Sequence, residues 1–343
     1  MRFDPSMVEG PYLRDILAQP RALEDTVAGL CDAPWLADLA GFDRIVLTGM
    51  GASYHALHPL HIQLVEHGFH AVAYETSELI HYFAAALAPR TLLVAVSQSG
   101  RSVEIVRLLD AAAGRLRTIG VTNTPGSPLA TRSDFTILTH AGAESSVSCK
   151  TFVATLAALE WLGAALRSAD RRQIESALQG AAPAAQGYLS GWKAKASSLA
   201  NLLDGVRSLF VTGRGASMAA AGAGGLILKE SAHFHAEGMT CSAFRHGPFE
   251  MSGADAFVLV FAGDPKTAAL NEKLVLDVRN AGGRAALIGP QSDVDAFRIP
   301  LTPPAIRPVV EILPVQLVSL ALAALAGLEP GKFRLLTKVT TIE

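Results

Sequence analysis

A group of polar side chains follows an apolar run in the first half of the chain. The run, Leu92 to Val96, is typical of a buried parallel strand, and a helical pattern begins near Val103. The polar residues beside them are Ser97, Gln98, Ser99 and Ser102. Free N–H groups at a helix start favour an anion, and hydroxyls can donate further hydrogen bonds to it. We interpret the stretch as a phosphate-binding loop, with serines that only cap the helix as the plainer alternative.

The second half of the chain repeats the first. The motif TGMGAS at 48–53 returns as TGRGAS at 212–217, each copy after a short apolar run and before a helix of small residues. The next apolar stretch also has a counterpart, because Leu93 to Val96 corresponds to Val258 to Phe261. Two copies of one α/β unit are therefore predicted.

The two copies differ where the anion would bind. The first reads SQSG at 97–100, whereas the second reads AGDP at 262–265. The second copy has lost the hydroxyls and gained the carboxylate of Asp264, which repels phosphate. We infer that only the first copy holds the anion.

The elements that carry this loop alternate between strand and helix. Strands are predicted at 44–47, 71–74, 92–96, 118–121 and 135–138, with helical patterns between them, which indicates an α/β fold with a parallel sheet covered on both faces. Residues 1 to about 30 suggest a polar arm with one short helix, Leu13 to Ala18, that stops at Pro20. A helical tract from 151 to 203, interrupted around 180–183, separates the halves.

Composition excludes several classes of protein. The 29 basic and 31 acidic residues nearly balance and form no basic cluster, so no nucleic-acid partner is expected. The apolar run 312–328 contains polar residues and is shorter than the roughly 20 residues of a membrane span, so we expect a buried helix and no membrane partner. No signal peptide is visible, and three widely spaced cysteines, Cys31, Cys149 and Cys241, fit a reducing cytoplasm.

Cofactor and metal motifs are weak. The G-x-G at 49–51 lacks the third glycine of a dinucleotide fingerprint, so NAD binding has little support, and no nucleotide-triphosphate loop occurs. His55, His58 and His61 have a spacing that could suggest a metal, but the third leaves the face of the first and no acidic or cysteine partner is evident. We therefore expect no cofactor and no metal.

Several short motifs are familiar in combination. They are GMGASY at 49–54, SQSG at 97–100, AGAE at 141–144, GRG at 213–215, KE at 229–230, HAE at 235–237, HGP at 246–248 and RLLTKVTTIE at 334–343. In this order they resemble the sugar isomerase (SIS) family and, over nearly the full length, the isomerase half of glucosamine-6-phosphate synthases. The resemblance implies two tandem SIS domains, each a five-stranded parallel sheet flanked by helices on both faces, and a homodimer whose sites are shared between subunits. The implied boundaries are an arm at 1–30, domains at 31–168 and 169–330, and a tail at 331–343.

The resemblance also implies roles for individual residues. The phosphate cup falls on Ser53, Ser97, Gln98, Ser99 and Ser102. The segment that contacts sugar hydroxyls falls on Ser148 and Cys149, and its spacing leaves open which of the two meets the sugar. The catalytic positions are Glu230 as the C1–C2 base, His246 as the ring-opening group from the neighbouring subunit, and Lys338 as the imine-forming lysine. His235 and Glu237 are expected to support the site.

These residue types suit the chemistry. Aldose–ketose interconversion needs a base beside a carbon acid, and a carboxylate partly desolvated against an apolar helix, as Glu230 could be, has a raised pKa. An imine needs an unprotonated lysine, and Lys338 lies in a tail that could cover an occupied site and exclude water. Histidine can exchange a proton with a ring oxygen near neutral pH.

Two departures from the synthase pattern shape the functional hypothesis. Ile227 replaces the first lysine of the K-L-K-E stretch, and the chain has neither an amino-terminal cysteine nucleophile nor a glutaminase domain. We expect a phosphosugar isomerase/deaminase that converts an amino-sugar phosphate, such as glucosamine 6-phosphate, to fructose 6-phosphate and ammonia. The alternatives are an isomerase or deglycase for another phosphosugar, such as fructosamine 6-phosphate, and a non-catalytic sugar-phosphate sensor.

Overall fold

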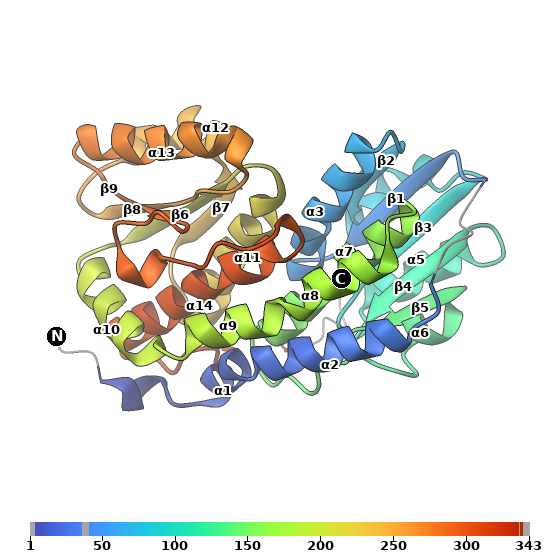
Figure 1. Ribbon diagram of the computed structural model, residues 1–343, viewed down its shortest axis with the longest axis horizontal. Coiled ribbons are helices and arrows are strands. Elements are labelled where there is room, and N and C mark those ends of the chain that lie inside the picture. Colours follow the sequence, from blue (N-terminus) through green and yellow to red (C-terminus); the bar gives the residue numbers. More distant parts are fainter. Residues whose placement is uncertain (1–3, 36–40, 336, 339–343) are drawn as a thin grey trace. The chain divides into compact units, whose positions relative to one another are not determined.

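The computed structural model describes residues 4–35, 41–335, 337 and 338 of the chain. They divide into two compact units (Figure 1). The first-sheet unit comprises residues 21–144 and 150–180 with the described part of 335–343, and the second-sheet unit comprises residues 1–20, 145–149 and 181–334. The tail motif at 334–343 is described only at four positions, and the remainder of it lies outside the described residues.

The first sheet is parallel throughout. Its strands are β1 Arg44–Gly49, β2 Ala71–Glu75, β3 Thr91–Val96, β4 Arg117–Thr122 and β5 Phe135–Leu138, in the order β2-β1-β3-β4-β5. All six residues of β3 are buried, as expected for a central strand covered on both faces. The five predicted strands are therefore confirmed, each to within two residues at its ends.

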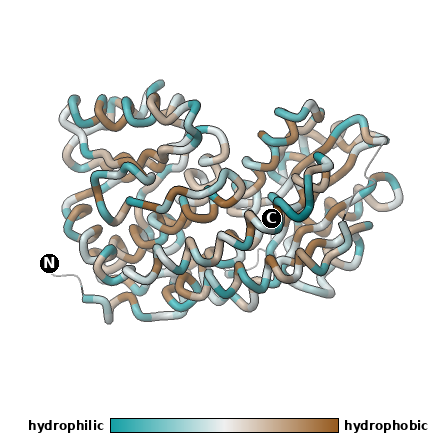
Figure 2. Tube along the Cα trace, in the orientation of Figure 1, coloured by the Kyte–Doolittle hydropathy of each residue, from teal (hydrophilic) through white to brown (hydrophobic). Residues whose placement is uncertain are grey.

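Helices cover this sheet. They are α2 Gln19–Asp32, α3 Ala52–Glu66, α4 Thr76–His81, α5 Val103–Ala112, α6 Pro128–Arg132, α7 Lys150–Leu166 and α8 Arg171–Gln179, with the 3-10 helix η2 Ala84–Ala86. Almost every residue of α7 is buried, because its sequence is apolar on all sides. Apolar residues colour the strands and this helix brown in Figure 2.

The second sheet is also parallel, with the order β7-β6-β8-β9. Its strands are β6 Ser208–Gly213, β7 Ala236–Thr240, β8 Ala256–Phe261 and β9 Arg284–Ile288. The helices of this unit are α1 Pro11–Leu17, α9 Ala181–Leu189, α10 Trp192–Leu203, α11 Met218–Ala232, α12 Cys241–Arg245, α13 Pro265–Asn280 and α14 Arg307–Leu325, with the 3-10 helices η1 Pro5–Val8, η3 Gly215–Ser217, η4 Pro248–Met251, η5 Asp295–Phe297 and η6 Pro304–Ile306. Two parallel α/β sheets confirm the predicted fold class.

The second sheet has four strands rather than the five expected. The counterpart of β5, at the repeat offset, is 299–302, and the structure gives this stretch no strand. Pro300 lies inside it and has no N–H to donate to a ladder, which disfavours a paired strand.

The repeat is confirmed in three dimensions. The strand β6 begins 164 residues after β1, and each is followed by a glycine with positive φ, Gly51 at 52° and Gly215 at 56°. L-residues with a Cβ rarely adopt this backbone, so the second glycine of each G-x-G makes the turn from strand to helix possible. The shared motif is thus a turn signal in both copies.

Two helix predictions were wrong. The amino-terminal segment is not a polar arm with one helix, because α2 follows α1 directly and Pro20 lies in the first turn of α2, where proline is tolerated. Its side chains Tyr12, Leu13 and Ile16 are buried in the second-sheet unit. The tract from 151 to 203 forms four helices, with breaks at 167–170 and 190–191 besides the one near 180.

The apolar run near the carboxyl end forms α14, as predicted. The segment Pro304–Leu325 is long and apolar enough to pass for a membrane span by length and composition, but 94% of its apolar window is buried within the protein. Core helices of globular proteins meet the same criterion, and α14 packs on α10 and α11 of its own unit.

Close packing of α11 on β7 is expected to depend on two glycines. A Cβ added to Gly225 would collide with the backbone nitrogen of Gly238, and one added to Gly238 would collide with the Ala221 carbonyl. Gly225→Ala should lower the free energy of unfolding by about 2 kcal/mol or more, because backbone cannot move aside as a side chain can. Gly187→Ala, at an exposed position of α9 with open space around it, is the control and should raise the free energy of unfolding by about 0.5–1 kcal/mol. If urea unfolding shows that both variants change the free energy of unfolding in the same direction, the packing argument is contradicted.

Candidate functional site

The polar loop lies where the strand order of the first sheet reverses. The chain runs from β1 outward to β2 and then returns past β1 to β3, so the loops after β1 and β3 diverge at a topological switch point. Gly49 and Val96, the last residues of β1 and β3, pair in register. Ser53 and the 97–102 loop therefore follow adjacent strand ends, at the edge where ligands of open α/β sheets bind.

Two helix starts at this edge are open. Within the described chain, neither Gly51 before α3 nor Ser102 before α5 makes a side-chain hydrogen bond that caps its helix. The loop is instead held from within, because the Ser97 hydroxyl accepts the Gly100 N–H at 3.1 Å and the Ser99 hydroxyl accepts the Arg101 N–H at 3.3 Å. The N–H groups of the α5 start are thus available to an anion.

The corresponding edge of the second sheet is occupied by protein carboxylates. Asp264 accepts the Lys266 N–H at 2.9 Å, which caps α13, and lies 3.8 Å from the Arg307 guanidinium. Ser217, the counterpart of Ser53, donates its hydroxyl to buried Glu311 at 2.9 Å. These contacts support the inference that the first copy alone is suited to hold phosphate.

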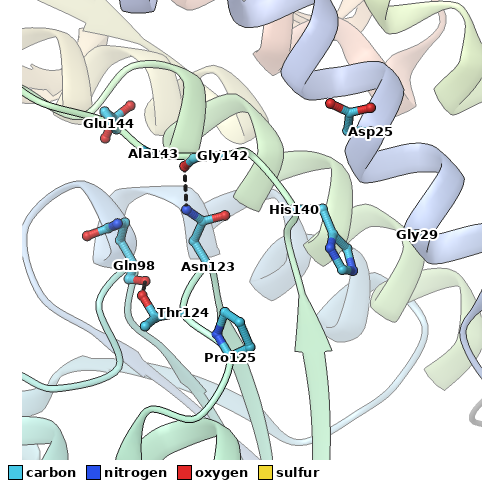
Figure 3. Close-up of a pocket in the computed structure, with 10 residues that line it drawn as sticks. All are labelled: Asp25, Gly29, Gln98, Asn123, Thr124, Pro125, His140, Gly142, Ala143 and Glu144. Carbon is cyan, nitrogen blue, oxygen red and sulfur yellow. Dashed lines mark hydrogen bonds between the residues drawn. The ribbon is translucent and has the colours of Figure 1, made fainter.

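A cavity of about 800 Å³ opens beside the first-sheet loop. It lies over the ends of β3, β4 and β5, and its lining includes Gln98, Asn123, Thr124, His140 and Glu144 (Figure 3). Apart from Asp25 of α2, the polar residues of the lining come from three successive loops at the carboxyl edge of the sheet. The cavity therefore combines a predicted phosphate ligand with groups that could meet the rest of a sugar.

Asn123 joins these loops. Its side-chain oxygen accepts the Ala141 N–H at 2.8 Å and the Thr139 hydroxyl at 3.0 Å, and its side-chain nitrogen donates to the Gly142 carbonyl at 2.8 Å (Figure 3). Its backbone N–H donates to the Gln98 carbonyl at 3.1 Å. One asparagine thus ties the loop after β5, which leads to Glu144, to the phosphate-binding loop.

Glu144, one of the residues that line this cavity, pairs with Lys338. The Lys338 Nζ donates to Glu144 Oε2 at 2.7 Å. The carboxylate also accepts the Thr151 N–H at 3.0 Å and the Thr151 hydroxyl at 2.6 Å, at the start of α7. Sequence reasoning noted Glu144 only as the last letter of the AGAE motif and assigned it no role. Its place in the loop between a predicted strand and the following helical tract was the available signal.

The other catalytic candidates belong to the second-sheet unit. Glu230 lies in the last turn of α11 and is half-buried, after the buried Ile227 and Leu228. His246 follows α12 directly and is exposed. His235 and Glu237, at the start of β7, are also exposed. Their catalytic and supporting roles remain predictions from the family resemblance.

The sugar-contact segment is anchored in the second-sheet unit. The Ser145 N–H donates to Asp15 at 2.9 Å, and the Ser146 hydroxyl donates to the Gly331 carbonyl at 2.5 Å. Cys149 is fully buried, whereas the Ser148 side chain is partly exposed. Burial thus favours Ser148 as the residue of the pair that could meet a sugar.

The three histidines of α3 do not gather around one point. His61 Nε2 lies 3.1 Å from the Ala71 carbonyl, and the rings of His55 and His58 stack with centroids 6.3 Å apart. Burial lowers the pKa of His58, with a smaller contribution from the nearby His61. Throughout the described ranges, no three His, Cys, Asp or Glu side chains form a cluster able to hold a metal ion.

Comparison with known proteins identifies the family. The SIS domain model matches residues 38–165 and 202–326, one match for each sheet. The chain belongs to the SIS family. Glutamine–fructose-6-phosphate aminotransferase [isomerizing] of Pyrococcus horikoshii is 33% identical over 96% of the chain, and the chain spans 57% of that relative's length.

Solved SIS structures share the whole fold. The C-terminal domain of glucosamine-fructose-6-phosphate aminotransferase from Francisella tularensis is 22% identical with a TM-score of 0.83, covering 96% of this chain and 99% of that one. Glucosamine-6-phosphate deaminase from Thermotoga maritima is 18% identical with a TM-score of 0.81, covering 97% and 100%. The likeness to these two structures therefore extends over nearly the whole double α/β architecture of this chain.

Buried Glu311 should make stability depend on pH. Burial raises its pKa to about 7, opposed in part by the Ser217 hydrogen bond and the Arg307 charge. The folded state holds the Glu311 proton more tightly than the unfolded chain does. The protonated carboxyl therefore contributes fully to the free energy of unfolding below about pH 4.5, and this contribution is lost as the pH rises through about 7. Glu311→Gln cannot ionise, so its free energy of unfolding relative to the parent should rise between about pH 5 and pH 8, on the order of 3 kcal/mol. If urea unfolding gives the parent and Glu311→Gln free energies of unfolding that change in parallel with pH, Glu311 does not titrate as a buried carboxyl.

Proposed function

We propose that this SIS protein is a phosphosugar isomerase/deaminase that converts an amino-sugar phosphate, such as glucosamine 6-phosphate, to fructose 6-phosphate and ammonia. One observation carries the proposal most directly. Lys338, the predicted imine-forming lysine, binds Glu144, and Glu144 lines the same cavity as Gln98 of the phosphate-binding loop. A reactive amine beside an anion site suits a phosphorylated carbonyl compound better than a neutral ligand.

The proposed roles follow the order of the reaction. The loop at 97–102 and Ser53 bind the phosphate, and His246 opens the sugar ring. Glu230 then moves a proton from C2 to C1, which converts the 2-amino aldose to the C2 imine of the ketose. Lys338 gives one ammonium proton to Glu144, attacks C2 as a neutral amine and expels ammonia, and water hydrolyses the resulting lysine imine to release fructose 6-phosphate and the free lysine.

The similarity to the aminotransferase supports isomerase chemistry. The relative from P. horikoshii carries "isomerizing" in its name, and the aligned part is 57% of its length. Ile227 stands where the synthase pattern K-L-K-E has its first lysine, so a cation expected near the substrate is missing from this chain. No disulfide joins Cys31, Cys149 and Cys241, all of which lie in the described part of the chain, and this agrees with the expected reducing cytoplasm.

The first test measures both products. Purified protein with glucosamine 6-phosphate should release ammonium and fructose 6-phosphate in equal amounts. Glu230→Gln and Lys338→Ala should each lower kcat/KM at least about 100-fold, because each removes a group that acts on the reacting carbons. Lys332→Ala removes another tail lysine, one that is exposed and paired with Glu329, and should leave turnover unchanged.

Other outcomes distinguish the alternatives. Products without ammonium from a different phosphosugar would indicate an isomerase or a deglycase. If no tested sugar is converted, but glucosamine 6-phosphate raises the Tm and Lys338→Ala binds it as tightly, the protein is a sensor and the enzymatic proposal is wrong.

The proposed homodimer predicts complementation between inactive variants. Because His246 is expected to reach the site of the neighbouring subunit, Lys338→Ala and His246→Asn should each be inactive alone. After unfolding and refolding as an equal mixture, half of the dimers are mixed, and each contains one intact site. Activity should then recover to roughly a quarter of the parent value. Light scattering is the control and should show that the refolded mixture is dimeric. A dimeric mixture that stays inactive would show that the two residues act within one subunit.

A further inference from the structure

The Glu144 carboxylate is set in place by the start of α7. Its side chain is 0% exposed, and it accepts the Thr151 N–H at 3.0 Å and the Thr151 hydroxyl at 2.6 Å. A helix amino terminus favours a negative charge, and two donors from one residue fix the plane of the carboxylate. Glu144 is therefore oriented by the body of the first-sheet unit, independently of the tail.

Lys338 completes this arrangement from a segment far along the chain. The Nζ–Oε2 distance is 2.7 Å between residues 194 positions apart. Burying a carboxylate is unfavourable unless it is paired and hydrogen-bonded, so removing the Lys338 ammonium from Glu144 would cost free energy. The pair is thus a charge-assisted hydrogen bond in a site largely closed to water.

Among the described residues of 335–343, exposure is inverted relative to polarity. Leu335 is 96% exposed, whereas the Lys338 side chain is only 26% exposed. A tail held by apolar packing would bury its leucine and leave its lysine in water. The described tail therefore docks through its charged group.

We propose that Glu144 is the positioning residue for Lys338: it holds the amine at the wall of the cavity that contains Gln98, before substrate arrives. This inference rests on the proposed function, because it takes Lys338 as the nucleophile of that reaction. An amine that is already held in one position needs only a small movement to reach a carbonyl carbon. An amine that is not held must first lose conformational entropy before it can react.

Glu144→Gln separates this role from simple helix capping. The amide oxygen can still accept the Thr151 N–H, so the start of α7 keeps an acceptor. The variant loses the negative charge that holds the ammonium. Glu329→Gln is the matched control, since it removes another glutamate–lysine pair, Glu329 and Lys332 at 3.2 Å, in which both side chains are exposed.

The first readout needs no substrate. Amine-reactive labelling of the free protein, followed peptide by peptide by mass spectrometry, should modify Lys338 slowly in the parent and at least about tenfold faster in Glu144→Gln. Labelling of Lys338 in Glu329→Gln should match the parent. Equal labelling of Lys338 in the parent and in Glu144→Gln would overturn the proposal, whether or not the protein proves to be a deaminase.

The second readout uses turnover and trapping. With glucosamine 6-phosphate, Glu144→Gln should lower kcat about 10- to 100-fold with KM within about twofold, because phosphate binding is untouched and only the amine is misplaced. Borohydride should trap the sugar on Lys338 more slowly in the same proportion. A raised KM at unchanged kcat would assign Glu144 to substrate binding instead.

A third variant guards against loss of folding. Should Glu144→Gln melt below the assay temperature, Glu144→Asp retains the charge with a side chain one methylene shorter. Its Lys338 should be labelled at a rate between those of the parent and Lys338 in the unfolded chain. Labelling of Glu144→Asp at the parent rate, although the shorter carboxylate falls short of Nζ, would contradict the proposed contact.

Discussion

The reversal of strand order between β1 and β3 is the constraint from which the candidate site follows. Parallel strands deliver their carboxyl ends to one edge, and the reversal sends the flanking connections apart, so the edge between them is left uncovered. Two helix starts without side-chain caps, those of α3 and α5, lie at that edge. Backbone donors and serine hydroxyls thus gather at this edge, which suits an anion.

The strand order of the second sheet reverses in the same way, but protein side chains occupy the corresponding edge. Asp264 caps α13, and Ser217 donates to the buried Glu311, so donors that would meet a phosphate in the first copy meet carboxylates in the second. One copy of the repeat has kept an open edge, and the other has exchanged it for internal hydrogen bonds. In the SIS fold, then, duplication supplies two equivalent frames, and a few side chains decide which of them can bind.

The contact between Glu144 and Lys338 joins local and distant parts of the first-sheet unit. Asn123 positions the loop that leads to Glu144, Thr151 orients its carboxylate, and the tail brings the ammonium. Each step uses a hydrogen bond to a group that would be costly to bury alone. The cavity wall is therefore organised by polar contacts, while the apolar strands and α7 beneath it supply the rigidity.

The amino-acid sequence by itself determined the local features of this protein. Apolar runs of strand length predicted all five strands of the first sheet, and the glycine turns at 49–51 and 213–215 revealed the repeat, because both signals depend on neighbouring residues only. Pro20 was misread as a helix stop, since its place in the first turn of α2 depends on where that helix begins. Only tertiary structure decided the rest: that the amino-terminal helices are buried, that Asp264 and Glu311 close the second edge, and that Glu144 meets a lysine 194 residues away. These contacts arise when the folded chain brings distant groups together, and no local spacing encodes them.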